Sequence, residues 1–230
     1  MIKHLFIDFN GTLLDDIDLC LELLNKMLKD QNKELVDIKR YKEIFTFPVK
    51  NYYVKAGIDF NIESFESLAK KFMDEYVIEY KKCKLFDGVI ETLDFLKSKG
   101  FKLYILSASK QSILDEQCKY YKLISHFDKI IGIKTIYANS KEDVAKEFIY
   151  NSGINKSEAL FIGDTLHDSE VANIVGIKSI LVASGHQSKN VLSRANTKII
   201  DNLNVLKENF DEIFNWWNIQ GFPYWWITIW

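Results

Sequence analysis

The stretch HLFIDFNGTL, residues 4–13, decides the fold of this chain. Its apolar run at residues 5–7 predicts a buried strand, and Asp8 and a Gly-Thr turn at residues 11–12 follow it directly. In open α/β sheets, ligands bind beyond the carboxyl ends of the strands. The stretch therefore places a carboxylate where such a fold carries out its chemistry.

The composition of the chain is that of a globular protein, with 47% hydrophobic and 27% charged residues among 230. This length allows one large domain, or a core with a modest insert. The formal net charge is −2 and no basic stretch suits a phosphate backbone, so we expect no nucleic-acid partner. No apolar run reaches the roughly 18–20 residues that span a bilayer, so we expect no membrane span.

The three cysteines, Cys20, Cys83 and Cys118, lie far apart and form no CxxC pair. This spacing favours reduced thiols over a disulfide framework or a metal site. The first three residues lead straight into the first expected strand, without the pattern of a signal peptide. We therefore expect a cytoplasmic protein.

Strand and helix patterns alternate in the second half of the chain, and several of the helical patterns end at a glycine. The expected strands after the first are residues 102–106, 129–132, 159–163, 178–183 and 198–200. Repeated βα units predict an α/β fold, a Rossmann-like doubly wound parallel sheet with helices on both faces. Right-handed crossovers would bring the carboxyl ends of the strands to one edge.

Residues 15–84 interrupt this alternation with helical patterns only. The expected helices cover residues 19–28, 49–57 and 62–80. We therefore expect an inserted all-helical domain at residues 15–84, and a core made of residues 1–14 and 85–215.

All five tryptophans lie in the segment WWNIQGFPYWWITIW, residues 216–230. We treat this segment as a separate Trp-rich tail. An apolar tail folded onto the body is the interpretation we prefer. A homodimer interface or a contact with a membrane surface stays open.

Four short signals with reactive side chains fall at successive points of the βα pattern. They are Asp8-Phe9-Asn10-Gly11-Thr12, Ser107 at the end of its strand, Lys141 at the start of a helix, and Gly163-Asp164-Thr165-Leu166-His167-Asp168. Each signal alone is common, since a serine at a strand end often caps a helix. Their order and placement resemble the four motifs of the haloacid-dehalogenase-like (HAD) superfamily. The likeness covers residues 1–14 and about 85–205.

The resemblance implies a phosphatase of the phosphoglycolate-phosphatase-like branch, in which the helical insert acts as a cap. It implies Asp8 as the nucleophile that forms an aspartyl-phosphate. A cation must offset the repulsion between a carboxylate and a phosphate, and Mg²⁺ suits this role. The implied ligands are the Asp8 side chain, the backbone carbonyl of Asn10, Asp164, and Asp168 directly or through water.

The implied phosphate-binding set is Asp8, Gly11, Thr12, Ser107, Ala108 and Lys141. Ser107 and the backbone N–H groups after it would donate to phosphate oxygens at a helix N-terminus. Lys141 would neutralise charge on Asp8 and on the phosphoryl group, with Lys146, one turn along, as the alternative.

Candidate substrate contacts in the insert are Lys50, Asn51, Tyr52 and Tyr53, which suit a small phosphorylated metabolite. His186 follows the strand at residues 178–183 and reaches the same edge of the sheet. A contact with the substrate or with the insert stays open for this histidine, and loop geometry is the interpretation that we prefer.

Asn10 departs from the usual pattern, because phosphatases of the family carry a second aspartate there that protonates the leaving group and then activates water. A carboxamide can orient groups but cannot relay protons, and general acid–base catalysis is worth roughly 10²–10⁴-fold. Three outcomes stay open. The protein is a phosphatase that is slow or restricted to good leaving groups, or it uses another acid (His167, Asp15 or Asp16) through water, or it is a phosphate-binding or regulatory module with little turnover.

Two other branches of the superfamily fit less well. Dehalogenases carry an aromatic residue in place of Asn10 and need no Mg²⁺. Phosphonatases carry a small residue there and a cap lysine that forms a Schiff base, a role that Lys50 could take. We therefore predict a Mg²⁺-dependent phosphomonoester hydrolase that acts through Asp8.

Overall fold

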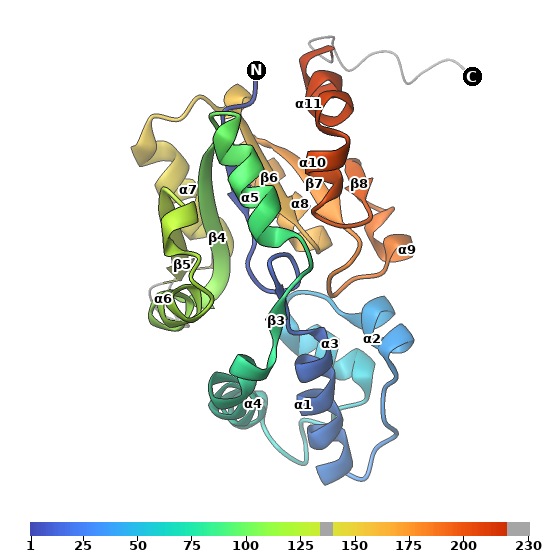
Figure 1. Ribbon diagram of the computed structural model, residues 1–230. Helices are drawn as coiled ribbons and strands as arrows, with labels where there is room; N and C mark the ends of the chain where they lie inside the picture. The colour runs from blue at the N-terminus through green and yellow to red at the C-terminus, as the bar shows by residue number, and fades with distance from the viewer. Residues whose placement is uncertain (134–139, 220–230) are drawn as a thin grey trace, which may run out of the picture.

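The computed structural model of the chain describes residues 1–133 and 140–219. It has two parts, a sheet flanked by helices and a helical unit beyond one edge of that sheet (Figure 1). The roles expected for the Trp-rich tail at residues 216–230 concern side chains that lie outside this description. None of the described helices is long and apolar enough to cross a membrane.

The sheet has six strands in the order β5-β4-β1-β6-β7-β8, and every neighbouring pair is parallel. The strands are β1 (His4–Ile7), β4 (Lys102–Lys110), β5 (Lys129–Ile133), β6 (Ala159–Gly163), β7 (Lys178–Val182) and β8 (Lys198–Ile200). The first strand of the chain therefore lies at the centre, between β4 and β6. This topology confirms the predicted α/β fold.

Alternate residues of β1 face opposite sides of the sheet, as the pleat of a strand requires. Leu5 and Ile7 pack with α5, α6, α10 and α11, whereas Phe6 packs with α7 and α8 on the other face. These helices are α5 (Val89–Ser98), α6 (Gln111–Tyr120), α7 (Lys141–Ser152), α8 (Leu166–Val175), α10 (Val205–Glu208) and α11 (Phe210–Ile219). Shorter elements are α9 (Lys189–Leu192), η1 (Tyr80–Lys82), η2 (Ile124–His126) and η3 (Lys156–Glu158).

Four helices form the insert: α1 (Ile17–Asp30), α2 (Ile38–Ile44), α3 (Val49–Ala56) and α4 (Phe65–Glu79). Leu24, Leu28, Tyr41 and Tyr53 are buried in its own hydrophobic core. A two-stranded antiparallel pair, β2 (Leu14–Asp15) with β3 (Lys84–Leu85), joins the insert to the sheet (Figure 1). We refer to residues 17–82 as the helical insert.

Several boundaries differ from the sequence-based expectation. α4 begins at Phe65 rather than near residue 62, because the Ser64 hydroxyl caps it by accepting from the N–H of Ser67 at 3.2 Å. β4 continues to Lys110, with an irregular register against β5 after residue 106. Ser107 therefore lies inside β4 rather than at the end of the strand. The pattern analysis did not predict α2 or the β2–β3 pair.

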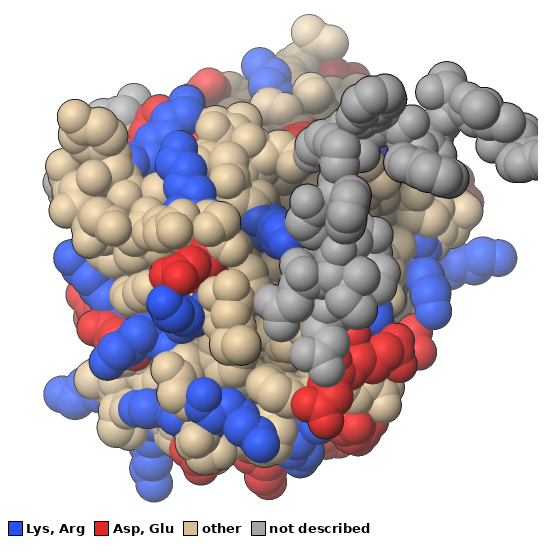
Figure 2. Space-filling model, turned by 90° about the horizontal axis from the view of Figure 1, so that it is seen from above, with Lys and Arg blue, Asp and Glu red and all other residues tan. Residues whose placement is uncertain are grey.

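Charged side chains are interspersed on the face of the molecule seen in Figure 2, where lysines and arginines lie in several separate places with acidic residues between them. This mixture agrees with the formal net charge of −2.

Candidate active site

Asp8 and Asp164 come together because β1 and β6 are parallel neighbours that end at the same edge of the sheet. The backbone N–H of Asp8 donates to the carbonyl of Ile162 at 2.8 Å, which continues the strand pairing as far as Asp8. Asp8, Asp164 and Asp168 are buried, and each offers a carboxylate oxygen within 4.8 Å of the others. This edge faces the helical insert (Figure 1).

Lys141, the first residue of α7, lies among these carboxylates. Its Nζ is 2.9 Å from Oδ2 of Asp8 and 2.5 Å from Oδ1 of Asp168, and the residue is only 3% exposed. A capping box on Ser140 begins the helix and fixes its first turn. Lys146, one turn along, is exposed. The structure thus brings Lys141, and not its alternative, to the carboxylate cluster.

Asp168 is held by the loop between β6 and α8. Its Oδ2 accepts from the backbone N–H groups of Asp164 and Thr165 and from the Thr165 hydroxyl, at 3.1, 2.9 and 2.7 Å. Only glycine fits at position 163, since a Cβ there would lie 2.3 Å from Cγ of Asp168. With Lys141 on its other oxygen, Asp168 is suited to orient neighbouring groups.

Asp164 is held from three sides. Its Oδ1 accepts from the Thr12 hydroxyl at 3.0 Å, and its Oδ2 accepts from the backbone N–H of His186 at 2.7 Å. Gly11 and Gly185 pack against the carboxylate so closely that a Cβ at either position would lie 2.3 Å from Oδ2. Gly11 also has a φ of +70°, which favours glycine. The turn at residues 11–12 is therefore fitted around Asp164.

The electrostatics of this cluster favour a bound cation. Burial, together with the carboxylates of Asp168 and Asp164, raises the pKa of Asp8 to about 7 against the opposing effect of Lys141. Burial likewise raises the pKa of Asp164 to about 6. Burial would also raise the pKa of Asp168, but its ion pair with Lys141 holds it below the ordinary value. Clustered hard oxygen donors of this kind fit a divalent cation such as Mg²⁺.

The second motif lies beside the cluster at the irregular part of β4. Ser107 is buried, and its Oγ accepts from the backbone N–H of Ser109 at 3.1 Å, whereas Ala108 is exposed. Thr12 is buried, and its hydroxyl donates to Asp164. This contact suits Thr12 to orient the Asp164 carboxylate.

Asn10 makes three side-chain hydrogen bonds. Its Nδ2 donates to Oδ2 of Asp16 at 2.8 Å and to the Tyr76 hydroxyl at 2.6 Å. Its Oδ1 accepts from the Ser109 hydroxyl at 2.9 Å. The amide therefore joins the first motif to the helical insert and to β4.

Asp16 and His186 form a buried pair that the sequence analysis did not foresee, although it named Asp16 as one alternative acid. Nε2 of His186 lies 3.2 Å from Oδ1 of Asp16, and the Tyr41 hydroxyl is 2.9 Å from Nδ1. Burial alone would lower the pKa of His186, but the Asp16 carboxylate raises it above its ordinary value. Burial opposes ionisation of Asp16 as well, yet His186 and the hydrogen bonds hold the Asp16 pKa below its usual range.

The insert residues proposed as substrate contacts differ in their exposure to solvent. Lys50 is exposed, and its Nζ lies over two phenylalanine rings of the insert, 5.5 and 6.0 Å from their centroids. Asn51 is exposed, and Tyr52 and Tyr53 are buried in the core of the insert. The Tyr52 hydroxyl has no hydrogen-bond partner within the described part of the chain. A substrate role for these residues stays a prediction.

His167 lies in the fourth motif, and its ring stacks on Phe47 of the insert at 4.7 Å between centroids. Its two ring nitrogens lie 3.7 Å from Glu142 and 3.6 Å from Glu170. These contacts place His167 at the boundary between the core and the insert.

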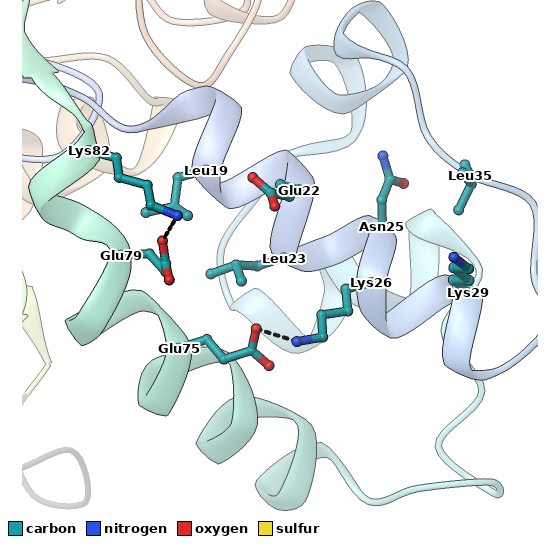
Figure 3. A pocket seen from close by; sticks show the side chains of 10 residues that line it. All are labelled: Leu19, Glu22, Leu23, Asn25, Lys26, Lys29, Leu35, Glu75, Glu79 and Lys82. Atoms are coloured by element: carbon teal, nitrogen blue, oxygen red, sulfur yellow. Dashed lines mark hydrogen bonds and ion pairs between the residues drawn. The ribbon is translucent and has the colours of Figure 1, made fainter.

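A pocket of about 450 Å³ opens between α1 and α4 (Figure 3). Lysine and glutamate side chains line most of it, among them an ion pair between Lys26 and Glu75 at 2.6 Å. None of its lining residues belongs to the four motifs. The reactive groups are therefore gathered at the sheet edge and not in this pocket.

The fold and the strand-end cluster of carboxylates with one lysine define a class of α/β hydrolytic enzymes. The sequence profile of the haloacid dehalogenase-like hydrolases matches residues 5–182, and the chain belongs to this family. The phosphoglycolate phosphatase of Aquifex aeolicus is 30% identical over 223 residues, covering 87% of this chain and 98% of the relative. Phosphoglycolate phosphatase 1 of Pseudomonas aeruginosa is 24% identical over 208 residues, covering 86% and 76%.

Solved structures agree at the level of the fold. A haloacid dehalogenase-like family hydrolase from Streptococcus pneumoniae gives a TM-score of 0.77 at 21% identity, covering 91% of this chain and 98% of that chain. Together the matches confirm the family, the fold and the phosphatase class that the sequence motifs predicted.

Proposed function

We propose that this protein is a Mg²⁺-dependent phosphomonoester hydrolase that forms an aspartyl-phosphate on Asp8. The observation that carries the proposal is the buried cluster in which Lys141 bridges Asp8 and Asp168, with Asp164 beside them. The relatives named phosphoglycolate phosphatases support a small phosphorylated metabolite as the substrate class. The three free cysteines support a cytoplasmic location.

In the first step, an oxygen of Asp8 would form a bond to phosphorus while the bond from phosphorus to the leaving oxygen breaks. Lys141 would neutralise charge on Asp8 and on the phosphoryl oxygens. Ser107 and the N–H of Ala108 would donate to those oxygens. In the second step, water would attack phosphorus and release Asp8.

Mg²⁺ would be held by the side chains of Asp8 and Asp164 and the backbone carbonyl of Asn10, with Asp168 contributing directly or through water. When bound, it supplies positive charge that lowers the repulsion between the Asp8 carboxylate and the substrate. Because residue 10 would contribute its backbone carbonyl, the Asn10 side chain leaves this set of donors complete.

The Asn10 side chain restricts the reaction instead at proton transfer. An amide cannot protonate the leaving oxygen, so substrates with good leaving groups, such as acyl and aryl phosphates, should turn over faster than alkyl phosphates. The insert would exclude water from the site and contact the leaving group, with Lys50, Asn51 and Tyr52 as the expected contacts.

The test is phosphate release from phosphoglycolate, other small phosphomonoesters, acetyl phosphate and an aryl phosphate, with Mg²⁺ or with a chelator. Wild type is compared with Asp8→Asn and with Asp74→Asn, a control in which an exposed carboxylate loses its surface pair with Lys70. Turnover that needs Mg²⁺ and Asp8 and survives Asp74→Asn is the expected result. Mg²⁺-dependent phosphate binding without turnover of any compound would support a binding or regulatory module instead.

A further inference from the structure

The Asp16 carboxylate lies at the junction of the core and the insert, directly before α1, and it is 1% exposed. A buried carboxylate is costly unless it is paired and hydrogen-bonded. Its partners are Nδ2 of Asn10 at 2.8 Å, the Tyr76 hydroxyl at 2.7 Å, the N–H of Gly11 at 3.2 Å, Nε2 of His186 at 3.2 Å and the Cys20 thiol at 3.7 Å. Both oxygens are therefore fully engaged.

These partners come from both parts of the molecule. Asn10 and Gly11 belong to the first motif and His186 to the loop after β7, whereas Tyr76 belongs to α4 of the insert. The His186 loop also contacts α2 through the Tyr41 hydroxyl. In the same region, the backbone N–H of Ser188 donates to the carbonyl of Lys42 at 3.1 Å. Asp16 is thus the central acceptor in a network that holds the insert against the site.

Asn10 fits this network only as an amide. Its Nδ2 donates to Asp16 and also lies within hydrogen-bond distance of the Tyr76 hydroxyl, which itself donates to Asp16. Its carbonyl oxygen accepts from Ser109. An ionised aspartate at position 10 would have the same shape but no donor, and two carboxylate oxygens would then face each other at about 2.8 Å.

We propose that Asp16 is a positioning residue that holds the helical insert closed over the active site, and that residue 10 is an asparagine because it must donate to this carboxylate. The proposal rests on the proposed function for its kinetic consequence, but not for its structural one. Closure would exclude water and complete the substrate site, so a loosened insert lowers the population that binds substrate productively.

The test uses Asn10→Asp, Asp16→Asn and the double variant that carries both changes. In each single variant the donor and acceptor no longer match, so residues 17–82 should exchange backbone hydrogens faster, while β1 and β6 keep wild-type protection. KM for a small phosphate ester should rise about 10-fold or more. In the double variant the carboxylate and the amide have changed places, so both readouts should return to within about threefold of wild type.

Asp18→Asn is the matched control, because Asp18 is a nearby carboxylate in the first turn of α1 and is exposed. It should change neither readout. If a single variant does not fold, Tyr76→Phe gives the same test, since it removes one donor to Asp16 and leaves the ring stacked on Phe72. It should speed exchange in the insert while the core stays protected.

A double variant no better than the worse single variant would overturn the proposal, as would an Asn10→Asp protein whose insert exchanges like wild type. The exchange readout does not require turnover. Failure of the proposed phosphatase activity would therefore appear separately. The protein would release no phosphate, while hydrogen exchange in the insert would still become faster in the single variants and return toward wild type in the double variant.

Discussion

Two buried polar clusters meet at the carboxyl edge of the sheet, and they are built differently. The catalytic cluster of Asp8, Lys141, Asp164 and Asp168 draws every side chain from the core. The closure cluster, made of Asn10, Asp16, Tyr76 and His186, joins the core to the insert. The comparison indicates that the reactive groups belong to the core alone, whereas the position of the insert depends on contacts between the two parts of the molecule.

The two clusters also touch. The backbone N–H of Gly11 donates to Asp16 while Gly11 packs against Asp164, and the N–H of His186 donates to Asp164 while its ring lies beside Asp16. Gly11 and His186 therefore connect the Asp16 cluster to Asp164, although no residue of the insert enters the catalytic cluster.

The largest effect should come from breaking the catalytic cluster. Lys141→Ala leaves Asp8 and Asp168 buried without their cation, which should lower the free energy of unfolding by about 3–5 kcal/mol and abolish turnover. Urea unfolding and phosphate release measure both. Lys146→Ala, on the exposed side of the same helix, is the control and should change neither. An active and fully stable Lys141→Ala protein would contradict the assigned role.

Exchanging the charges of the closure cluster should have the next largest effect, and it should depend on the substrate. With Asn10→Asp and Asp16→Asn together, a carboxyl group stands where the family places its acid and base. Turnover of alkyl phosphates should then rise about 10-fold or more relative to aryl phosphates, because only poor leaving groups need the proton. Equal changes in kcat for both classes would show that Asn10 does not limit proton transfer.

The next effect in size is the pH dependence of stability, which reports on the catalytic cluster. Folded Asp8 keeps its proton up to about pH 7, whereas an unfolded aspartate loses it near 3.8, so the folded state binds more protons across this range. Stability of the metal-free protein should therefore fall as pH rises from about 4 to about 7. Thermal unfolding in a chelator measures this slope. Asp8→Asn or added Mg²⁺ should make it shallower, and an unchanged slope in both cases would contradict the electrostatic account.

The smallest effect is expected at Lys50, which lies over aromatic rings of its own insert. Lys50→Ala should raise KM and change kcat by less than about twofold, because a residue that only contacts the bound substrate does not take part in the chemical step. Borohydride treatment with substrate should leave the protein unmodified. Inactivation by borohydride that Lys50→Ala abolishes would instead revive the Schiff-base alternative.

The core could be predicted from sequence because local rules determine it, whereas the catalytic cluster could be predicted because the four short signals resemble the HAD motifs. Apolar runs mark the strands, parallel βα connections place the strand ends at one edge, and Asp8, Lys141 and Asp164 each stand at an element boundary. The irregular course of β4 around Ser107 could not be predicted, because it depends on pairing with β5.

The closure cluster could not be predicted in the same way. Asp16 and His186 lie in distant parts of the sequence and meet only through the seating of the insert. The β2–β3 pair has two residues in each strand, too few for a periodic pattern. In α2, IKRYKEI, Tyr41 is the single buried residue, so the helix shows no apolar face before its partners are known. The one sequence feature that pointed to this cluster was the pair of adjacent carboxylates, Asp15 and Asp16. In the structure Asp15 is exposed and Asp16 is buried.

The most direct test of the central claim is to trap the covalent intermediate. Wild type turning over an aryl phosphate with Mg²⁺ is quenched in acid, and peptide mass spectrometry locates any added phosphoryl group. The account predicts one acid-stable, base-labile phosphoryl group on Asp8 in wild type and none in Asp8→Asn. Steady phosphate release without an adduct on Asp8, or with equal release by Asp8→Asn, would contradict it.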